Sequence, residues 1–155
     1  KIDSNYFWGD LCKERIKYVR NFVYPNINTL KVCPIMPYHD QLRPYVNYWF
    51  ASTEAPDVNS FNKCLSIENQ NRLEIEGGAC IIYTHFGKDF VSKGELNPTF
   101  MKLMENLSNK DGWFVTATQL LDYILENKKD KKISNNQRSS LERKWLFHKL
   151  NVGTS

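Results

Sequence analysis

The 155-residue sequence has no long apolar run, and this absence argues against a membrane-spanning protein. No stretch approaches the roughly 18 apolar residues of a membrane span, so we expect no transmembrane segment. The first residues also lack the apolar region of a secretory signal. With six Pro and seven Gly, the composition excludes collagen-like and low-complexity chains. The chain is also shorter than a complete (β/α)₈ barrel, which typically needs about 250 residues.

Several catalytic and metal-binding motifs are missing as well. The sequence has no glycine-rich phosphate loop, no H-E-x-x-H, no H-x-x-x-H, no G-x-S-x-G and no C-x-x-C pair. Its four cysteines are widely spaced, and Cys33 and Cys80 lie inside apolar runs, where cysteine usually behaves as a small hydrophobic residue. We therefore expect reduced thiols and a cytoplasmic protein.

Aromatic residues and a local excess of positive charge are what the chain does contain. Nine Phe, eight Tyr and four Trp supply enough apolar area for a folded core. Residues 126–155 hold eight basic and three acidic side chains, whereas residues 1–125 hold 13 basic and 14 acidic ones, which gives the net charge of +4. We interpret residues 1–125 as an α/β domain, residues 126–138 as a basic linker and residues 139–155 as a C-terminal helix. Nucleic acid is not an expected partner, because nothing before residue 126 supplies a basic and aromatic surface.

Hydrophobic periodicity predicts alternating helices and strands. The predicted elements are a helix over 10–24, an edge strand over 29–36, a loop over 37–44, an extended segment over 46–51, helices over 66–76 and 97–107, strands over 79–83 and 113–116, and helices over 118–125 and 139–152. Strands that alternate with helices are typical of a parallel sheet. The sequence therefore predicts an α/β fold with mainly parallel strands and a C-terminal helix.

Polar side chains next to the predicted strands are the candidate site residues. Thr84 and His85 directly follow the strand over 79–83, and functional groups of parallel α/β folds sit at the carboxyl ends of strands. His85 could act there as a general acid or base, with Thr84 beside it in the substrate site. A histidine that only hydrogen-bonds a backbone carbonyl is the alternative.

The loop over 37–44 holds a second set of candidates. His39 and Asp40 could bind a metal ion or orient a general base, and Arg43 could bind a carboxylate or phosphate. Adjacent residues in an extended loop point apart, so a loop held by hydrogen bonds is the alternative. Trp49 could stack on a sugar ring or pack in the core.

The run GGACIIYTHF at 77–86, the helix around Phe100 to Leu107, the run DGWFV at 111–115 and the run LLDY at 120–123 together resemble the C-terminal part of polysaccharide deacetylase-like (NodB-type) proteins. A weaker likeness extends over residues 43–47. The resemblance implies a distorted (β/α) barrel that removes N- or O-acetyl groups from sugar polymers with a divalent metal, zinc or similar. His85 matches the histidine that is taken as the general acid in that family.

Other motifs of that family are missing from the sequence. The first missing motif is an apolar strand followed by paired aspartates, and no two acidic residues of the sequence are adjacent. The second is a pair of metal-binding histidines. Because the chain also begins without Met, we expect the C-terminal part of a partial or distorted barrel, or a chain that pairs with a second copy. One alternative is a non-catalytic carbohydrate-binding or assembly domain that uses Tyr48, Trp49 and Trp113. A second is a metal site rebuilt by His39 and Asp40, and a third is an adaptor that binds anionic membranes through residues 126–149.

Overall fold

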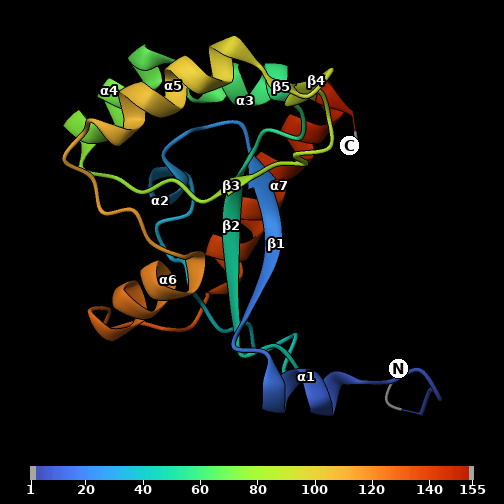
Figure 1. The fold of residues 1–155 in the computed structure, drawn as a ribbon. Coiled ribbons are helices and arrows are strands. Elements are labelled where there is room, and N and C mark those ends of the chain that lie inside the picture. The colour runs from blue at the N-terminus through green and yellow to red at the C-terminus, as the bar shows by residue number, and fades with distance from the viewer. Residues whose placement is uncertain (1–2, 154–155) are drawn as a thin grey trace.

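Three parallel strands form the centre of the fold (Figure 1). The computed structural model describes residues 3–153, and its strands β1 (Tyr18–Tyr24), β2 (Tyr48–Glu54) and β3 (Ile82–Tyr83) lie in the order β1-β2-β3. Tyr24 pairs with Thr53 and Glu54 pairs with Tyr83, so the three strands end at one edge of the sheet, which we call the carboxyl edge. The described residues thus form an open parallel sheet and no closed barrel.

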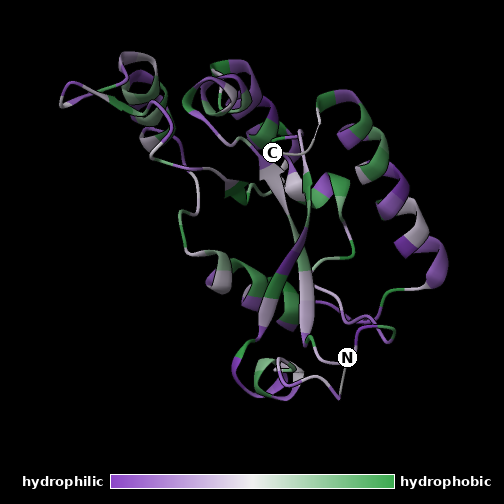
Figure 2. Ribbon diagram, turned by 90° about the vertical axis from the view of Figure 1, so that its right-hand side faces the viewer, coloured by the Kyte–Doolittle hydropathy of each residue, from purple (hydrophilic) through white to green (hydrophobic). Residues whose placement is uncertain are grey.

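Helices surround this sheet, and an antiparallel hairpin of β4 (Val91–Ser92) and β5 (Glu95–Leu96) lies apart from it. The helices are α1 (Gly9–Arg15), α2 (Thr29–Val32), α3 (Val58–Cys64), α4 (Ile67–Glu76), α5 (Pro98–Ser108), α6 (Ala117–Glu126) and α7 (Asn135–Val152). Helices α3, α4 and α5 gather beyond the carboxyl edge (Figure 1). The long helix α7 stands along one side of the sheet and carries many hydrophilic residues (Figure 2). Within residues 3–153, no helix is both long and apolar enough to cross a membrane.

Two hydrophobic clusters make up the core. The first joins the sheet to α7 and to the segment after α2, and its buried members include Phe22, Ala51, Met36 and Leu141. The second lies under α3, α4 and α5 at the carboxyl edge; its rings Phe61, Phe90 and Phe100 meet in edge-to-face contacts with centroids 5.2 to 5.5 Å apart. The second cluster therefore anchors the segments that follow β2 and β3.

The structure confirms the predicted helices that carry a local start or stop signal. The Ser66 side chain accepts a hydrogen bond from the Asn69 backbone at the start of α4, and Gly77 ends that helix in the left-handed conformation with φ +58°. Asn97 caps α5, whose first residue is Pro98. The predicted extended segment after residue 46 is strand β2.

Two elements of the first half were predicted wrongly. Residues 18–24 form strand β1 and not the second half of a helix, because Phe22 and Tyr24 alternate into the core while the backbone pairs with β2. The helix was predicted because the apolar residues at 16, 19 and 23 have a spacing that also fits one face of a helix. The predicted strand over 29–36 is instead the short helix α2, whose first turn is held by Asn28, since its side chain accepts from the Lys31 backbone.

Three elements of the second half also differ from prediction. Residues 111–116 are not a strand, and Trp113 and Phe114 are exposed. Strand β3 is two residues long and half-buried, because among the described residues it pairs only with β2. Helix α7 begins four residues earlier than expected: Ser134, not Ser139, supplies the capping box.

Candidate active site at the carboxyl edge

Backbone hydrogen bonds hold His85 at the carboxyl edge. The Tyr83 carbonyl accepts from the Ala55 N–H at 3.0 Å, and the His85 N–H donates to the Pro56 carbonyl at 3.2 Å. The Lys88 N–H then donates to the His85 carbonyl at 2.9 Å and closes a turn. The end of β3 is thus fastened to the end of β2, and the exposed His85 is the second residue after the strand, at the strand end that the sequence predicted.

The His85 ring contacts Tyr83, which sequence reasoning missed as a site residue. The Tyr83 hydroxyl lies 2.5 Å from His85 Nε2, and the two rings meet edge to face at a centroid distance of 4.9 Å. Spacing could have suggested this pair, because residues two apart on a strand point to the same side. The hydroxyl oxygen of Thr84, the residue between them, is buried and has no hydrogen-bond partner among the described residues.

Arg20, from the opposite outer strand β1, completes this group. Its guanidinium carbon lies 3.8 Å from the centre of the Tyr83 ring. Since β2 separates β1 from β3, the Arg20 side chain reaches across the central strand. A positive charge is therefore held against the ring that contacts His85. No sequence signal marked Arg20, because its segment was interpreted as helical.

A second polar cluster at this edge surrounds the last residue of β2. The Glu54 carboxylate, with 8% of its side chain exposed, lies 2.6 Å from His148 Nε2 and accepts from Lys149 Nζ at 2.5 Å. Both partners of Glu54 belong to α7. This cluster fastens the end of the C-terminal helix to the carboxyl edge, and the His148 side chain, with 12% exposed, is part of that anchor.

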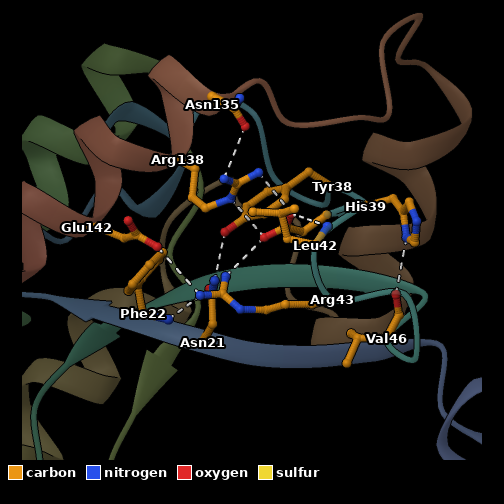
Figure 3. A network of polar contacts seen from close by, with 11 residues as sticks. Asn21, Phe22, Tyr38, His39, Leu42, Arg43, Val46, Asn135, Arg138 and Glu142 are labelled. Carbon is orange, nitrogen blue, oxygen red and sulfur yellow. Dashed lines mark hydrogen bonds and ion pairs between the residues drawn. The ribbon is translucent and has the colours of Figure 1, made fainter. Parts of the chain in front are cut away.

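The loop candidates form a separate network on the amino-terminal side of β2 (Figure 3). Asp40 is completely buried, and both of its oxygens are occupied. Oδ1 accepts from the Leu42 N–H and from Arg138 Nη2, and Oδ2 accepts from Arg43 Nη1 and Arg138 Nε, all at 3.0 Å. Two guanidinium groups thus neutralise this carboxylate and fasten the loop to α7.

His39 does not share a site with Asp40 in this structure. Its Nδ1 lies 3.2 Å from the Val46 carbonyl and 3.0 Å from the Asn47 carbonyl (Figure 3). Across residues 3–153, no group of three or more His, Cys, Asp or Glu side chains is placed to hold a metal ion. The described residues therefore do not fit the divalent metal that the resemblance implies.

The predicted substrate-binding residues are not brought together either. Trp49 is the second residue of β2 and lies five residues before its end, which corresponds to roughly 16 Å along the strand. The ring is half-buried against the first cluster, and Arg43 lies 5.8 Å from its centre. Arg43 and Trp49 thus lie near each other, on the amino-terminal side, while Thr84 and His85 lie at the carboxyl edge.

The basic residues after 126 are partly used inside the fold. The half-buried Lys128 amine donates to the Ile35 and Pro37 carbonyls, and burial lowers its pKa. Ile133 is buried in the first cluster. Arg138 and Lys149 add further contacts inside the fold, while most residues of the segment over 126–149, including Lys129 and Lys131, are exposed. Comparison of the chain with protein-family models, with curated proteins and with solved structures found no match.

Proposed function

We propose that the chain is the C-terminal part of a carbohydrate deacetylase-like hydrolase, and that its sheet belongs to a partial or distorted (β/α) barrel. The observation that carries the proposal is the exposed His85, the second residue after β3, at the edge where three parallel strands end. The barrel is supported by the open sheet, since the outer edges of β1 and β3 pair with no further strand among the described residues. Additional strands, or a second copy of the chain, would cover such edges.

The reaction would be hydrolysis of an N- or O-acetyl group on a polysaccharide or a sugar precursor. Water adds to the acetyl carbon, and the bond from that carbon to the sugar nitrogen or oxygen then breaks to release acetate. His85 acts at the second step, where its protonated ring gives a proton to the departing amine or alkoxide. A divalent metal would need ligands other than those of residues 3–153, so no step is assigned to it.

The test measures acetate released from acetylated oligosaccharides, with and without added zinc. The 155-residue chain and its full-length parent are compared, each as the unchanged protein and as the variants His85→Ala and Lys102→Gln. We expect His85→Ala to lower the rate of the parent by about 10²- to 10⁴-fold, the usual contribution of a general acid. Lys102→Gln changes an exposed residue of α5 and should leave the rate unchanged. A parent as inert as the chain, or an unchanged rate with His85→Ala, would contradict the proposal.

A non-catalytic carbohydrate-binding role is the second candidate, and an exposed aromatic pair formed by α6 and the segment before it favours this role. Trp113 is 60% exposed and meets Tyr123, which is 56% exposed, edge to face at 5.3 Å. Exposed aromatic faces are suited to stacking on sugar rings. Retention of glycan without any stoichiometric divalent ion, lost on Trp113→Ala, would favour this function over hydrolysis.

A further inference from the structure

We propose that Tyr83 positions the His85 ring so that Nδ1, and not Nε2, is the atom that gives a proton to the substrate. The role of Nδ1 as an acid rests on the proposed hydrolase function. The arrangement of the two side chains does not depend on it. Tyr83 is thus a positioning residue, which acts on substrate only through His85.

The geometry leaves one ring nitrogen of His85 free to meet a ligand. The Tyr83 hydroxyl occupies Nε2 at 2.5 Å. Within residues 3–153, no hydrogen-bond partner is placed on Nδ1, and the side chain is exposed. A substrate that approaches the carboxyl edge therefore meets Nδ1.

Both members of the pair are held in place by the sheet. The Tyr83 backbone pairs with Glu54 and accepts from Ala55, and the Arg20 guanidinium stacks on the Tyr83 ring at 3.8 Å. The His85 backbone donates to Pro56. Because backbone bonds to β2 and to the residues after it hold both residues, the two side chains meet at a fixed place at the end of the strands.

The chemistry of the two groups sets the direction of this bond. A neutral imidazole nitrogen is a better acceptor than a phenol oxygen, and a phenol O–H is the better donor. The Arg20 cation over the ring withdraws electron density and strengthens the hydroxyl as a donor. Tyr83 therefore donates to Nε2 of the neutral ring, and the ring proton resides on Nδ1.

The proton balance of the proposed step is consistent with this arrangement. When the ring is protonated, Nε2–H donates to the Tyr83 oxygen and Nδ1 still carries a proton. The Nδ1 proton passes to the departing sugar nitrogen or oxygen, and the neutral ring keeps the proton on Nε2. Exchange with solvent then restores the form with the proton on Nδ1.

Nitrogen-15 NMR of the histidine rings tests the proposal on the unliganded chain. The measurement is made at about pH 9, above the range in which histidine normally titrates. In the unchanged protein we expect His85 to carry its proton mainly on Nδ1. Tyr83→Phe should shift the tautomer ratio about tenfold toward Nε2–H, the form that predominates in free histidine, and such a factor corresponds to ~1.4 kcal/mol.

Tyr6→Phe is the matched control, because it removes an exposed phenol hydroxyl far along the chain from His85. It should leave the His85 tautomer unchanged, and unchanged signals from His39 and His148 would show that each variant is folded. A His85 proton mainly on Nε2 in the unchanged protein, or an unchanged ratio in Tyr83→Phe, would overturn the proposal. Because the NMR measurement uses no substrate, its result does not depend on the acetate assay. Failure of the acetate assay would therefore contradict only the hydrolase proposal.

Discussion

The buried Asp40 carboxylate allows a stability prediction whose size follows from its contacts. Arg138, with 11% of its side chain exposed, supplies two of the four hydrogen bonds to Asp40, both at 3.0 Å. Arg43 supplies one, and 43% of its side chain is exposed. Removing one partner of a buried ion pair costs about 3–5 kcal/mol, because a charge is left without compensation. A partly exposed pair is worth about 1 kcal/mol or less.

We therefore expect Arg138→Met to lower the free energy of unfolding by about 3–5 kcal/mol and Arg43→Met by about 1 kcal/mol. Urea unfolding at pH 7 measures both, provided that the slope of free energy against urea concentration is the same in all variants. Equal losses in the two variants would refute the reasoning.

The double variant Asp40→Leu with Arg138→Met separates the cost of an unpaired charge from lost packing. When both charges of a buried pair are replaced by apolar groups, the change is often neutral or stabilising. The double variant should therefore be more stable than Arg138→Met alone. A double variant that is less stable than the single one would mean that Arg138 acts mainly through its packing.

Two further predictions concern a tight glycine and the buried thiols. A Cβ on Gly78 would lie 2.1 Å from the buried Asn28 amide, whereas a Cβ on Gly87 would meet nothing within 4 Å. Gly78→Ala should thus lower the free energy of unfolding by about 1–3 kcal/mol, and Gly87→Ala should leave it unchanged or raise it by less than about 1 kcal/mol; equal effects would contradict this. Burial raises the pKa of Cys33 to about 12 and that of Cys64 to about 11, from 9.0. Above about pH 9 the unfolded chain loses thiol protons that the folded chain keeps, so the free energy of unfolding should fall as the pH rises toward 11. The lowered pKa of Lys128 has a smaller effect in the opposite direction. A urea midpoint that is the same at pH 8 and pH 10.5, under reducing conditions, would exclude this.

Local signals account for the part of the fold that the sequence predicted. The caps Ser66 and Asn97 and the terminator Gly77 lie within a few residues of the helices that they define. Strand β1 could not be recognised in this way, because its conformation is decided by pairing with β2 and not by its own apolar spacing. The predicted strand over 113–116 failed for the related reason that no neighbouring strand pairs with it.

The residues of the candidate site show the same difference between local signals and contacts with distant segments. The position of His85 was predictable, because it depends only on the strand that comes immediately before it. Spacing could have suggested Tyr83 as the partner of His85, two residues away. The partners from distant segments were not predictable: Arg138 is 98 residues from Asp40, and His148 is 94 residues from Glu54. Adjacency in the sequence suggested a His39–Asp40 pair, whereas the fold supplies Asp40 with guanidinium partners.

Helix α7 connects the polar cluster at Asp40 with the one at Glu54, and these contacts use part of the positive charge of residues 126–155. Near its start, Arg138 neutralises Asp40 on the amino-terminal side of β2, and near its end, Lys149 and His148 contact Glu54 at the carboxyl edge. Undocking α7 would remove cations from two buried carboxylates at once, which is costly in a medium of low polarity. Glu54 also pairs with Tyr83, the residue that contacts His85. Two basic residues of the C-terminal helix therefore stabilise the fold: Arg138 holds the loop at Asp40, and Lys149 supports the strand ends from which the candidate acid projects.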